Sequence, residues 1–310
     1  MSSFNENQEA FATVVVAKDL AVPQPALQSR FNRLYFTRRF FEWLFSAVLI
    51  FGGQEFLLKN GLYSPVWPAA GVGLSALFLR GDILVLGILT GSLTSYLFNN
   101  FPLTVSLGNS ILFTANLWLI RFCCLRFFGT IAPMHSTKVC LQFICVVLFF
   151  CAIHIGWQYL YYPDLPWLMG FIGEVNGILC LTPLCLSLEP FTVKRLFVKG
   201  SLPAWFAGGA IVIGHGLFFF LPVVVAIPWA MTLLVALCLF AHHFRAAPTG
   251  MTLLATSVVY LTGALEPFQL FQTTYPLRTV LAILGIFTLG TIMAILQSCR
   301  CTQVDYMSRP

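Results

Sequence analysis

The chain has 310 residues, of which 58% are hydrophobic and only 9% carry a charge, and its formal net charge is +6. An ordinary soluble domain is about 25% charged, so this composition excludes a soluble globular protein and indicates a helical membrane protein. The positive charge does not indicate nucleic-acid binding, because the charged residues lie at the ends of apolar segments.

The two ends of the chain are more polar than its middle. Residues 1–40 are expected to form a flexible cytoplasmic tail, whose last part, residues 31–40, mixes aromatic side chains with three arginines. Such a mixture favours the membrane interface, so this part is predicted to form an interfacial collar before the first span. Residues 41–298 are predicted to form the membrane domain, and residues 299–310 a short cytoplasmic tail.

Ten apolar segments follow one another, each near the roughly 20 residues that a helix needs to cross a bilayer. They are predicted at residues 41–58, 63–79, 82–98, 104–127, 137–161, 167–188, 204–221, 223–241, 249–264 and 278–298. Pro222 separates the seventh segment from the eighth, and those two can also form one re-entrant hairpin. The predicted fold class is therefore an all-α polytopic membrane protein, a bundle of eight to ten spans.

The basic residues predict the topology. If the N-terminus is cytoplasmic, only Lys59 and Arg278 of the 17 lysines and arginines fall on the outer side. Loops rich in lysine and arginine stay in the cytoplasm. This asymmetry predicts an even number of crossings with both termini cytoplasmic.

An internal repeat is weakly visible. Residues 66–80 resemble residues 227–241, and each stretch is followed by a basic turn and two more apolar segments. Segments one to four thus echo segments seven to ten, in parallel orientation because the offset is six crossings. Repeats of this kind are common in transporters, although apolar sequence of low complexity imitates them easily.

The segment at residues 167–183 is almost wholly apolar, yet Glu174 lies near its middle. At about 100° per residue, Gly170, Gly173 and Gly177 fall within about 60° of one another, beside Glu174. Small residues at this spacing let another backbone approach closely, so they predict a packing face. A carboxylate there costs roughly 2.5–3.5 kcal/mol on insertion scales, so it requires a partner or a proton. Glu174 is therefore either a protonatable or ligand-contacting group or a structural carboxyl bonded to a neighbouring helix.

Several polar residues inside the apolar segments are candidates for binding a ligand. The candidate ligand-binding residues are Trp67, Pro68, Asn109, His154, Glu174 and Asn176. Each also has a structural interpretation. Trp67 and Pro68 can serve as a membrane anchor and a helix start, and Asn109 and Asn176 can bond across helices. His154 is either a proton-sensing or ligand-binding group or half of a satisfied polar pair with the residue one turn later.

Weaker signals come from four further polar residues. Asn116 is expected to bond across helices, Gln158 is the neighbour of His154 on the same face, His215 is ambiguous, and Glu55 is expected to reach the interface. No catalytic group, metal site or cofactor is identified, because the chain lacks a CxxC pair, a zinc-protease HExxH and a phosphate loop. We therefore expect that the protein is not an enzyme.

Several motifs occur together in a fixed order. Residues 65–74 read PVWPAAGVGL, residues 87–95 read GILTGSLTS, a Gly-Asn pair stands at residues 108–109, and residues 173–183 read GEVNGILCLTP. Together they resemble the MASE1 family of membrane-associated sensor domains, whose motifs include P-x-W-P-x-x-G-x-x-L and G-D-x-x-G-I-L-x-x-x-P. The resemblance covers residues 41–298.

This resemblance implies a sensory module of the bacterial inner membrane, generally with eight spans. Such modules usually precede a cytoplasmic histidine kinase, diguanylate cyclase or phosphodiesterase. Two departures stand out: Glu174 takes the place of the family's usual aspartate, and no output domain is found after residue 298. We therefore expect the chain to signal through a separate cytoplasmic partner of one of these kinds.

Three functional hypotheses follow. The leading one is a sensory input module, in which a small ligand, a lipid-phase solute or a protonation state is bound among segments two, four, five and six. The alternative is a secondary transporter or proton-coupled carrier that uses Glu174. The third is a purely structural membrane subunit, in which Glu174 serves folding or assembly.

Overall fold

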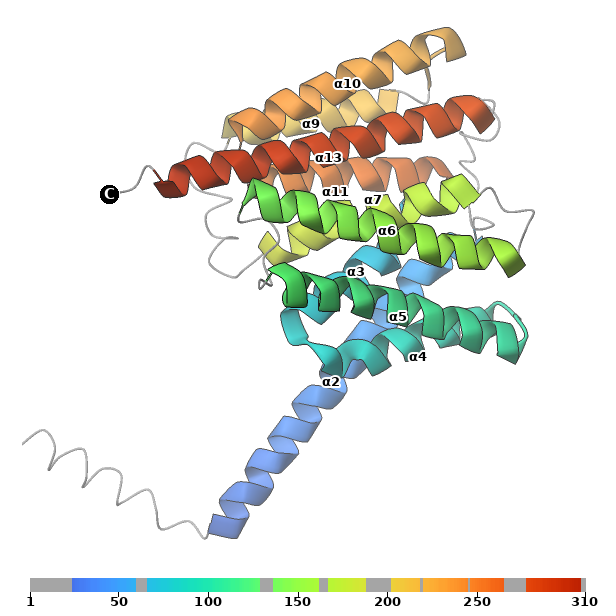
Figure 1. Cartoon of the computed structure of the whole chain (residues 1–310), viewed down its shortest axis with the longest axis vertical. Coiled ribbons are helices and arrows are strands. Elements are labelled where there is room, and N and C mark those ends of the chain that lie inside the picture. Colours follow the sequence, from blue (N-terminus) through green and yellow to red (C-terminus); the bar gives the residue numbers. More distant parts are fainter. Residues whose placement is uncertain are drawn as a thin grey trace, which may run out of the picture. The chain divides into compact units, whose positions relative to one another are not determined.

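The computed structural model describes residues 24–59, 66–128, 136–161, 167–187, 202–217, 220–244, 246–264 and 277–307. These residues form ten α-helices and contain no strand (Figure 1). The helices are α2 (Gln24–Lys59), α3 (Pro68–Arg80), α4 (Val85–Phe98), α5 (Leu103–Phe128), α6 (Thr137–Tyr161), α7 (Trp167–Ser187), α9 (Leu202–Leu217), α10 (Val223–His243), α11 (Ala246–Ala264) and α13 (Leu277–Met307). A 3₁₀ turn, η2 (Asp82–Leu84), joins α3 to α4.

The ten described helices correspond one for one with the ten predicted segments, which confirms the all-helical fold class. Five of them, α5, α6, α7, α10 and α13, are long and apolar enough to cross a membrane. Shorter apolar stretches lie in α3, α4, α9 and α11. The chain is an all-α polytopic membrane protein.

The helices extend beyond the predicted limits of the membrane domain at both ends. α2 begins at Gln24, so residues 24–40 of the predicted flexible tail are helical, while residues 1–23 lie outside the described part of the chain. α13 continues to Met307 and includes most of the predicted C-terminal tail. The apolar pattern marks where a membrane span stops. A helix continues until a residue breaks it: no Gly lies in either extension, and Pro25 stands in the first turn of α2, where proline is tolerated.

The chain divides into two compact units, residues 1–44 and residues 45–310. The described part of the first unit is the beginning of α2. There Glu42 accepts hydrogen bonds from Arg38 at 3.1 Å and from Arg39 at 3.2 Å, while the Phe36 and Phe41 rings are exposed. The interfacial position of this basic and aromatic stretch stays a prediction.

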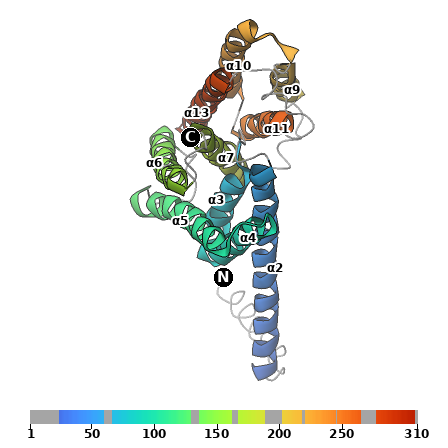
Figure 2. The ribbon, with the colours of Figure 1, turned by 90° about the vertical axis from the view of Figure 1, so that its right-hand side faces the viewer.

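The second unit is built around α7, which packs against α3, α6, α11 and α13 (Figure 2). In its most apolar 18-residue window 72% is buried, compared with 33–44% in the other four long helices. The segment that carries Glu174 is therefore the central helix of this unit, enclosed by protein rather than lipid.

α3 and α7 approach each other through glycine, as the predicted packing face requires. A Cβ atom on Gly177 would lie 2.0 Å from the carbonyl oxygen of Trp67, and one on Gly71 would lie 2.0 Å from the carbonyl oxygen of Gly177. The Trp67 backbone N–H donates to the Gly173 carbonyl at 2.8 Å. The prediction of a close backbone approach at this face is confirmed.

The predicted repeat relates the stretch that opens α3 to one inside α10. Pro222 separates α9 from α10, as expected. The tryptophans of the two stretches differ in environment: Trp229 donates from Nε1 to the Gly214 carbonyl at 2.9 Å, whereas the buried Nε1 of Trp67 has no acceptor within the described residues. The repeat stays a prediction.

Candidate functional site

Glu174 is fully buried on α7 and is surrounded by donors from two other helices. His154 of α6 places Nδ1 2.9 Å from both carboxylate oxygens, and Asn116 of α5 donates from Nδ2 to Oε1 at 3.0 Å. The thiol of Cys151, one turn before His154, lies within hydrogen-bonding reach of the same carboxyl. We call Asn116, Cys151, His154 and Glu174 the Glu174 cluster. It joins α5, α6 and α7 through one side chain.

The hydrogen bonds around His154 indicate its tautomer. If Nδ1 carries the proton and donates to Glu174, Nε2 is an acceptor, and the Gln158 amide lies 3.3 Å away with its nitrogen facing that atom. With the amide in this orientation, Nδ1 is the donor of the imidazole and Nε2 is its acceptor. A second proton on Nε2 would face the donor side of the amide, and Gln158 would have to turn its carbonyl oxygen inwards.

Aromatic rings enclose the imidazole. The ring of Trp67 stacks on His154, with centroids 5.8 Å apart and an angle of 24°, and on Phe113, with centroids 5.0 Å apart and an angle of 20°. Phe113 and His154 are themselves 6.0 Å apart. The imidazole therefore packs against aromatic faces rather than against aliphatic side chains.

Trp67 has a second role at the start of α3. It is the N-cap residue, in extended conformation, and Pro68 occupies the first turn that follows. The indole is 1% exposed and its N–H has no hydrogen-bond acceptor within the described residues. A buried donor without a partner costs about 1–3 kcal/mol, so this N–H needs an explanation such as water or a ligand.

The charge of the Glu174 cluster depends on one proton. Ionised Glu174 beside neutral His154 leaves a net charge of −1 among buried side chains, and one added proton cancels it. Asn116 and Cys151 are neutral partners of the carboxyl and do not change this count of charges. Isolated charge is expensive in the interior of a membrane protein, so a proton that cancels this charge is the chemical change that the pair can undergo.

The structure brings together three of the six candidate residues: Trp67, His154 and Glu174. Asn176 is fully buried but lies about 200° round α7 from Glu174, on another side of the helix. Pro68 occupies the position of a helix start. Asn109 lies two turns before Asn116 on α5 and lines a separate groove.

Of three further residues at the cluster, the sequence predicted the helix-bridging role of one, and it gave no role to the other two. Asn116 was expected to bond across helices, and its partner is Glu174. Cys151 and Phe113 are ordinary apolar residues in the sequence, and only the packing places them at the cluster. The spacing of Cys151, His154 and Gln158 along one helix face was the available signal.

Glu55 corrects one expectation. It was expected to reach the interface, but its residue is only 8% exposed. It accepts hydrogen bonds from Ser95 at 2.6 Å and Asn99 at 2.8 Å, and the adjacent Gln54 donates to Ser92 at 3.3 Å. The polar side chains of Gln54 and Glu55 on α2 are therefore paired with serine hydroxyls of α4 and with the amide of Asn99, the residue that follows α4. This second buried acid has hydroxyl and amide partners, whereas Glu174 has an imidazole.

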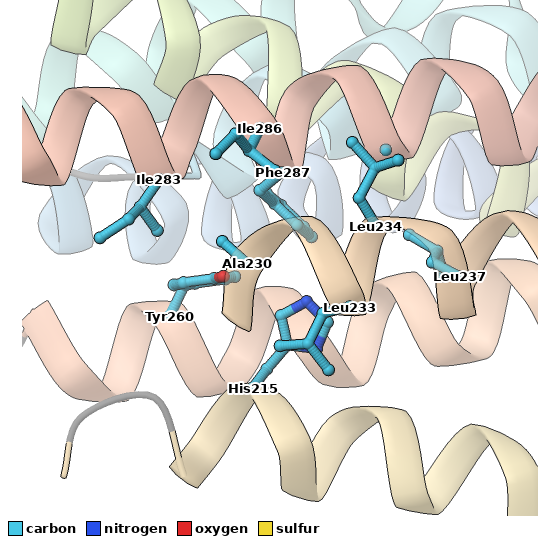
Figure 3. A pocket seen from close by; sticks show the side chains of 10 residues that line it. His215, Ala230, Leu233, Leu234, Leu237, Tyr260, Ile283, Ile286 and Phe287 are labelled. Carbon is cyan, nitrogen blue, oxygen red and sulfur yellow. The ribbon is translucent and has the colours of Figure 1, made fainter. Parts of the chain in front are cut away.

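His215 forms a second, mostly apolar centre where α9, α10, α11 and α13 meet (Figure 3). Its Nδ1 lies 2.8 Å from the Ile211 carbonyl, and its ring contacts Tyr260 and Phe287 edge-on, at 5.7 Å and 6.1 Å. The cavity beside it measures about 10 Å³, which is about enough for one water molecule. This cavity is too small for an organic ligand.

No group of three or more His, Cys, Asp or Glu side chains within the described residues could hold a metal ion. Comparisons of the chain with family profiles, with curated proteins and with solved structures found no match. The resemblance to MASE1 therefore rests on the motifs alone, and functional inference rests on the geometry of the Glu174 cluster.

Proposed function

We propose that the chain is a membrane-embedded signal-input module in which the His154–Glu174 pair takes up a proton and thereby changes the packing of α5 and α6 against α7. The observation that carries this proposal is the placement of His154 Nδ1 at 2.9 Å from both oxygens of a fully buried carboxylate. An intramembrane acid paired with an imidazole is a common element of proton-responsive membrane proteins.

The proton acts on the helices through the hydrogen bonds it changes. With neutral His154, Glu174 accepts from α5 and α6 at once. Protonating the carboxyl weakens its hold on Asn116, and protonating Nε2 of His154 requires Gln158 to turn. Both changes affect α5 and α6, whereas the α3–α7 contact is made mainly by backbone, glycine and hydroxyl groups. The two states therefore differ in how α5 and α6 lie on the α3–α7 pair.

The motifs shared with MASE1 support a sensory module of the bacterial inner membrane, and the basic residues support cytoplasmic termini. The partner that reads the change would then be a cytoplasmic histidine kinase, diguanylate cyclase or phosphodiesterase. Retaining a partner during purification in mild detergent, and losing its regulation by pH in Glu174→Gln, would connect the cluster with the output.

The test of proton uptake is infrared difference spectroscopy on the full chain in lipid vesicles, recorded between mildly acidic and mildly alkaline pH. We expect carboxyl and imidazole bands that change with pH and disappear in Glu174→Gln. Glu55→Gln is the matched control, because it removes the other buried acid and leaves the Glu174 cluster intact. A wild-type spectrum without pH-dependent carboxyl or imidazole bands, or bands that survive Glu174→Gln, would overturn the proposal.

The rival function is a proton-coupled carrier, which uses the same buried pair. Proteoliposomes with an imposed pH gradient separate the two. A carrier moves protons or solute across the membrane and loses this flux in Glu174→Gln. A sensor shows the infrared change without flux. Sustained proton flux that depends on Glu174 would replace the sensor proposal with the carrier.

A further inference from the structure

A groove of about 340 Å³ lies on the side of the bundle where α5 begins and α6 ends. It is lined by Thr104, Val105, Gly108, Asn109, Ile111 and Leu112 of α5 and by Trp157 of α6. This volume is in the range of small-molecule sites in proteins, which is about 300–1,000 Å³. A Cβ atom on Gly108 would meet no atom within 4 Å, so the glycine leaves an open notch in the wall.

Asn109 is the polar group of this groove. The residue is only 5% exposed, and it contributes the one carboxamide among the residues that line the groove. Asn109 stands six residues after the first residue of α5, about 9 Å along the helix axis. At that depth hydrocarbon offers no hydrogen bond, so a ligand group that bonds to the amide would be favoured.

The surroundings of the groove face lipid rather than protein. Leu103, Ile111, Ile153 and Leu160 are 53–73% exposed on the same two helices. The groove lining contains no charged residue. A ligand is therefore expected to arrive through the bilayer and to be uncharged, because an ionic head would find no counter-charge here.

We propose that this groove binds a neutral, membrane-dissolved amphiphile, whose hydroxyl or carbonyl group bonds to the Asn109 carboxamide and whose apolar body lies along Val105, Leu112 and Trp157. A carboxamide both donates and accepts, so it serves either head group. An alkane would fill the groove but leave the amide unpaired, and this difference gives the site its specificity.

This binding site goes beyond the proposed proton response, because ligand binding in the groove does not require proton uptake by the Glu174 cluster. It is nevertheless close to that cluster along the chain. Asn109 precedes Phe113 by one turn, and Trp157 directly precedes Gln158, the amide that faces His154. Occupation of the groove is thus placed to influence Phe113 and Gln158, which both lie beside the imidazole.

The test uses the full chain in phospholipid nanodiscs and two photoreactive probes, a diazirine-bearing hexadecanol and the matching hexadecane. After illumination, adducts are located by mass spectrometry. We expect the alcohol to label residues 104–112 and Trp157 above the level on other lipid-facing residues, and unlabelled hexadecanol to compete. Equal labelling by both probes, or labelling spread evenly over all helices, would overturn the proposal. These are also the outcomes expected if phospholipid fills the groove.

Two variants sharpen the assignment. Gly108→Leu fills the notch and should abolish labelling by both probes, whereas Gly209→Leu adds the same side chain at an equally open glycine on α9 and should leave it unchanged. Asn109→Leu should lower labelling by the alcohol about tenfold, the effect of roughly one hydrogen bond, and leave labelling by the alkane as it is. Retained selectivity for the alcohol in Asn109→Leu would contradict the role of the amide. The comparison of probes on the wild-type chain decides the proposal if a variant does not fold.

Discussion

The backbone N–H of Trp67 donates to the carbonyl of Gly173 at 2.8 Å, one residue before the buried acid Glu174. This bond ties the start of α3 to the middle of α7 and places the indole of Trp67 against His154. The position of the Trp67 ring against the imidazole is thus determined by a backbone contact. This contact depends on the absence of side chains at Gly71 and Gly177.

Substitution of Gly177 tests this contact. In Gly177→Ala the new methyl group would lie 2.0 Å from the Trp67 carbonyl oxygen, so the two helices must separate. We expect a loss of stability of about 1–3 kcal/mol, measured by thermal unfolding in detergent. Gly209→Ala is the control: its methyl group meets no atom within 4 Å, and alanine favours the helix by up to about 1 kcal/mol. Equal stability of the two variants would contradict the close approach.

The pairing of His154 with Glu174 predicts strong non-additivity. His154→Leu removes the main donor to a buried carboxylate and should cost about 3–5 kcal/mol. Adding Glu174→Leu removes the carboxylate left behind, so the double variant should be more stable than the sum of the two single losses, by about 1–3 kcal/mol. Reversible denaturant unfolding in detergent measures the cycle. Additive losses would mean that the two side chains do not share a proton or a hydrogen bond.

Gln158 should set the pH at which the cluster responds. Within the described residues, the groups that face His154 are Glu174, Trp67, Phe113 and Gln158, and of these four Gln158 contacts Nε2. Leucine there removes the carbonyl that can accept from a protonated Nε2, so Gln158→Leu should move the infrared response to lower pH. Gln158→Glu adds a carboxylate that stabilises the imidazolium and should move it to higher pH. Shifts in the same direction for both variants would contradict this account.

Two substitutions of Trp67 can separate a functional role of the indole from its contribution to stability. Because this buried N–H has no acceptor within the described residues, Trp67→Phe removes no hydrogen bond in that part of the chain and should change stability by about 1 kcal/mol or less. Trp67→Ala empties the space beside Phe113 and should cost about 3–5 kcal/mol. A change in the pH response of the stable Trp67→Phe variant would show that the indole, which stacks on His154, takes part in the response, and an unchanged response would contradict such a role.

Much of the fold follows from simple patterns in the sequence. Apolar segments and their limits predict the ten helices, and the spacing of Gly170, Gly173 and Gly177 predicts the packing face of α7. The pairing of side chains across helices does not follow in this way. His154 lies twenty positions before Glu174 in the chain, and whether their side chains meet depends on the rotation and height of α6 against α7. A change of one residue in that register would turn either side chain by about 100°.

Glu55 illustrates the same limit. Hydropathy places it near the end of an apolar segment, where an acid usually reaches water. Its burial results from Ser95 and Asn99, which stand on the face of α4 that meets α2. Hydroxyl and amide residues in an apolar helix show that partners exist, but the identity of those partners is decided by packing.

The carbonyl of Gly71 accepts hydrogen bonds from two hydroxyl groups, that of Ser75 on its own helix at 2.6 Å and that of Thr182 on α7 at 3.2 Å. Together with the glycine contacts, this makes α3 and α7 a natural fixed reference for spectroscopy. A pair of spin labels, one on each of these two helices, should report the same separation at every pH. A label pair between α6 and α3 should report two populations whose ratio follows the proton.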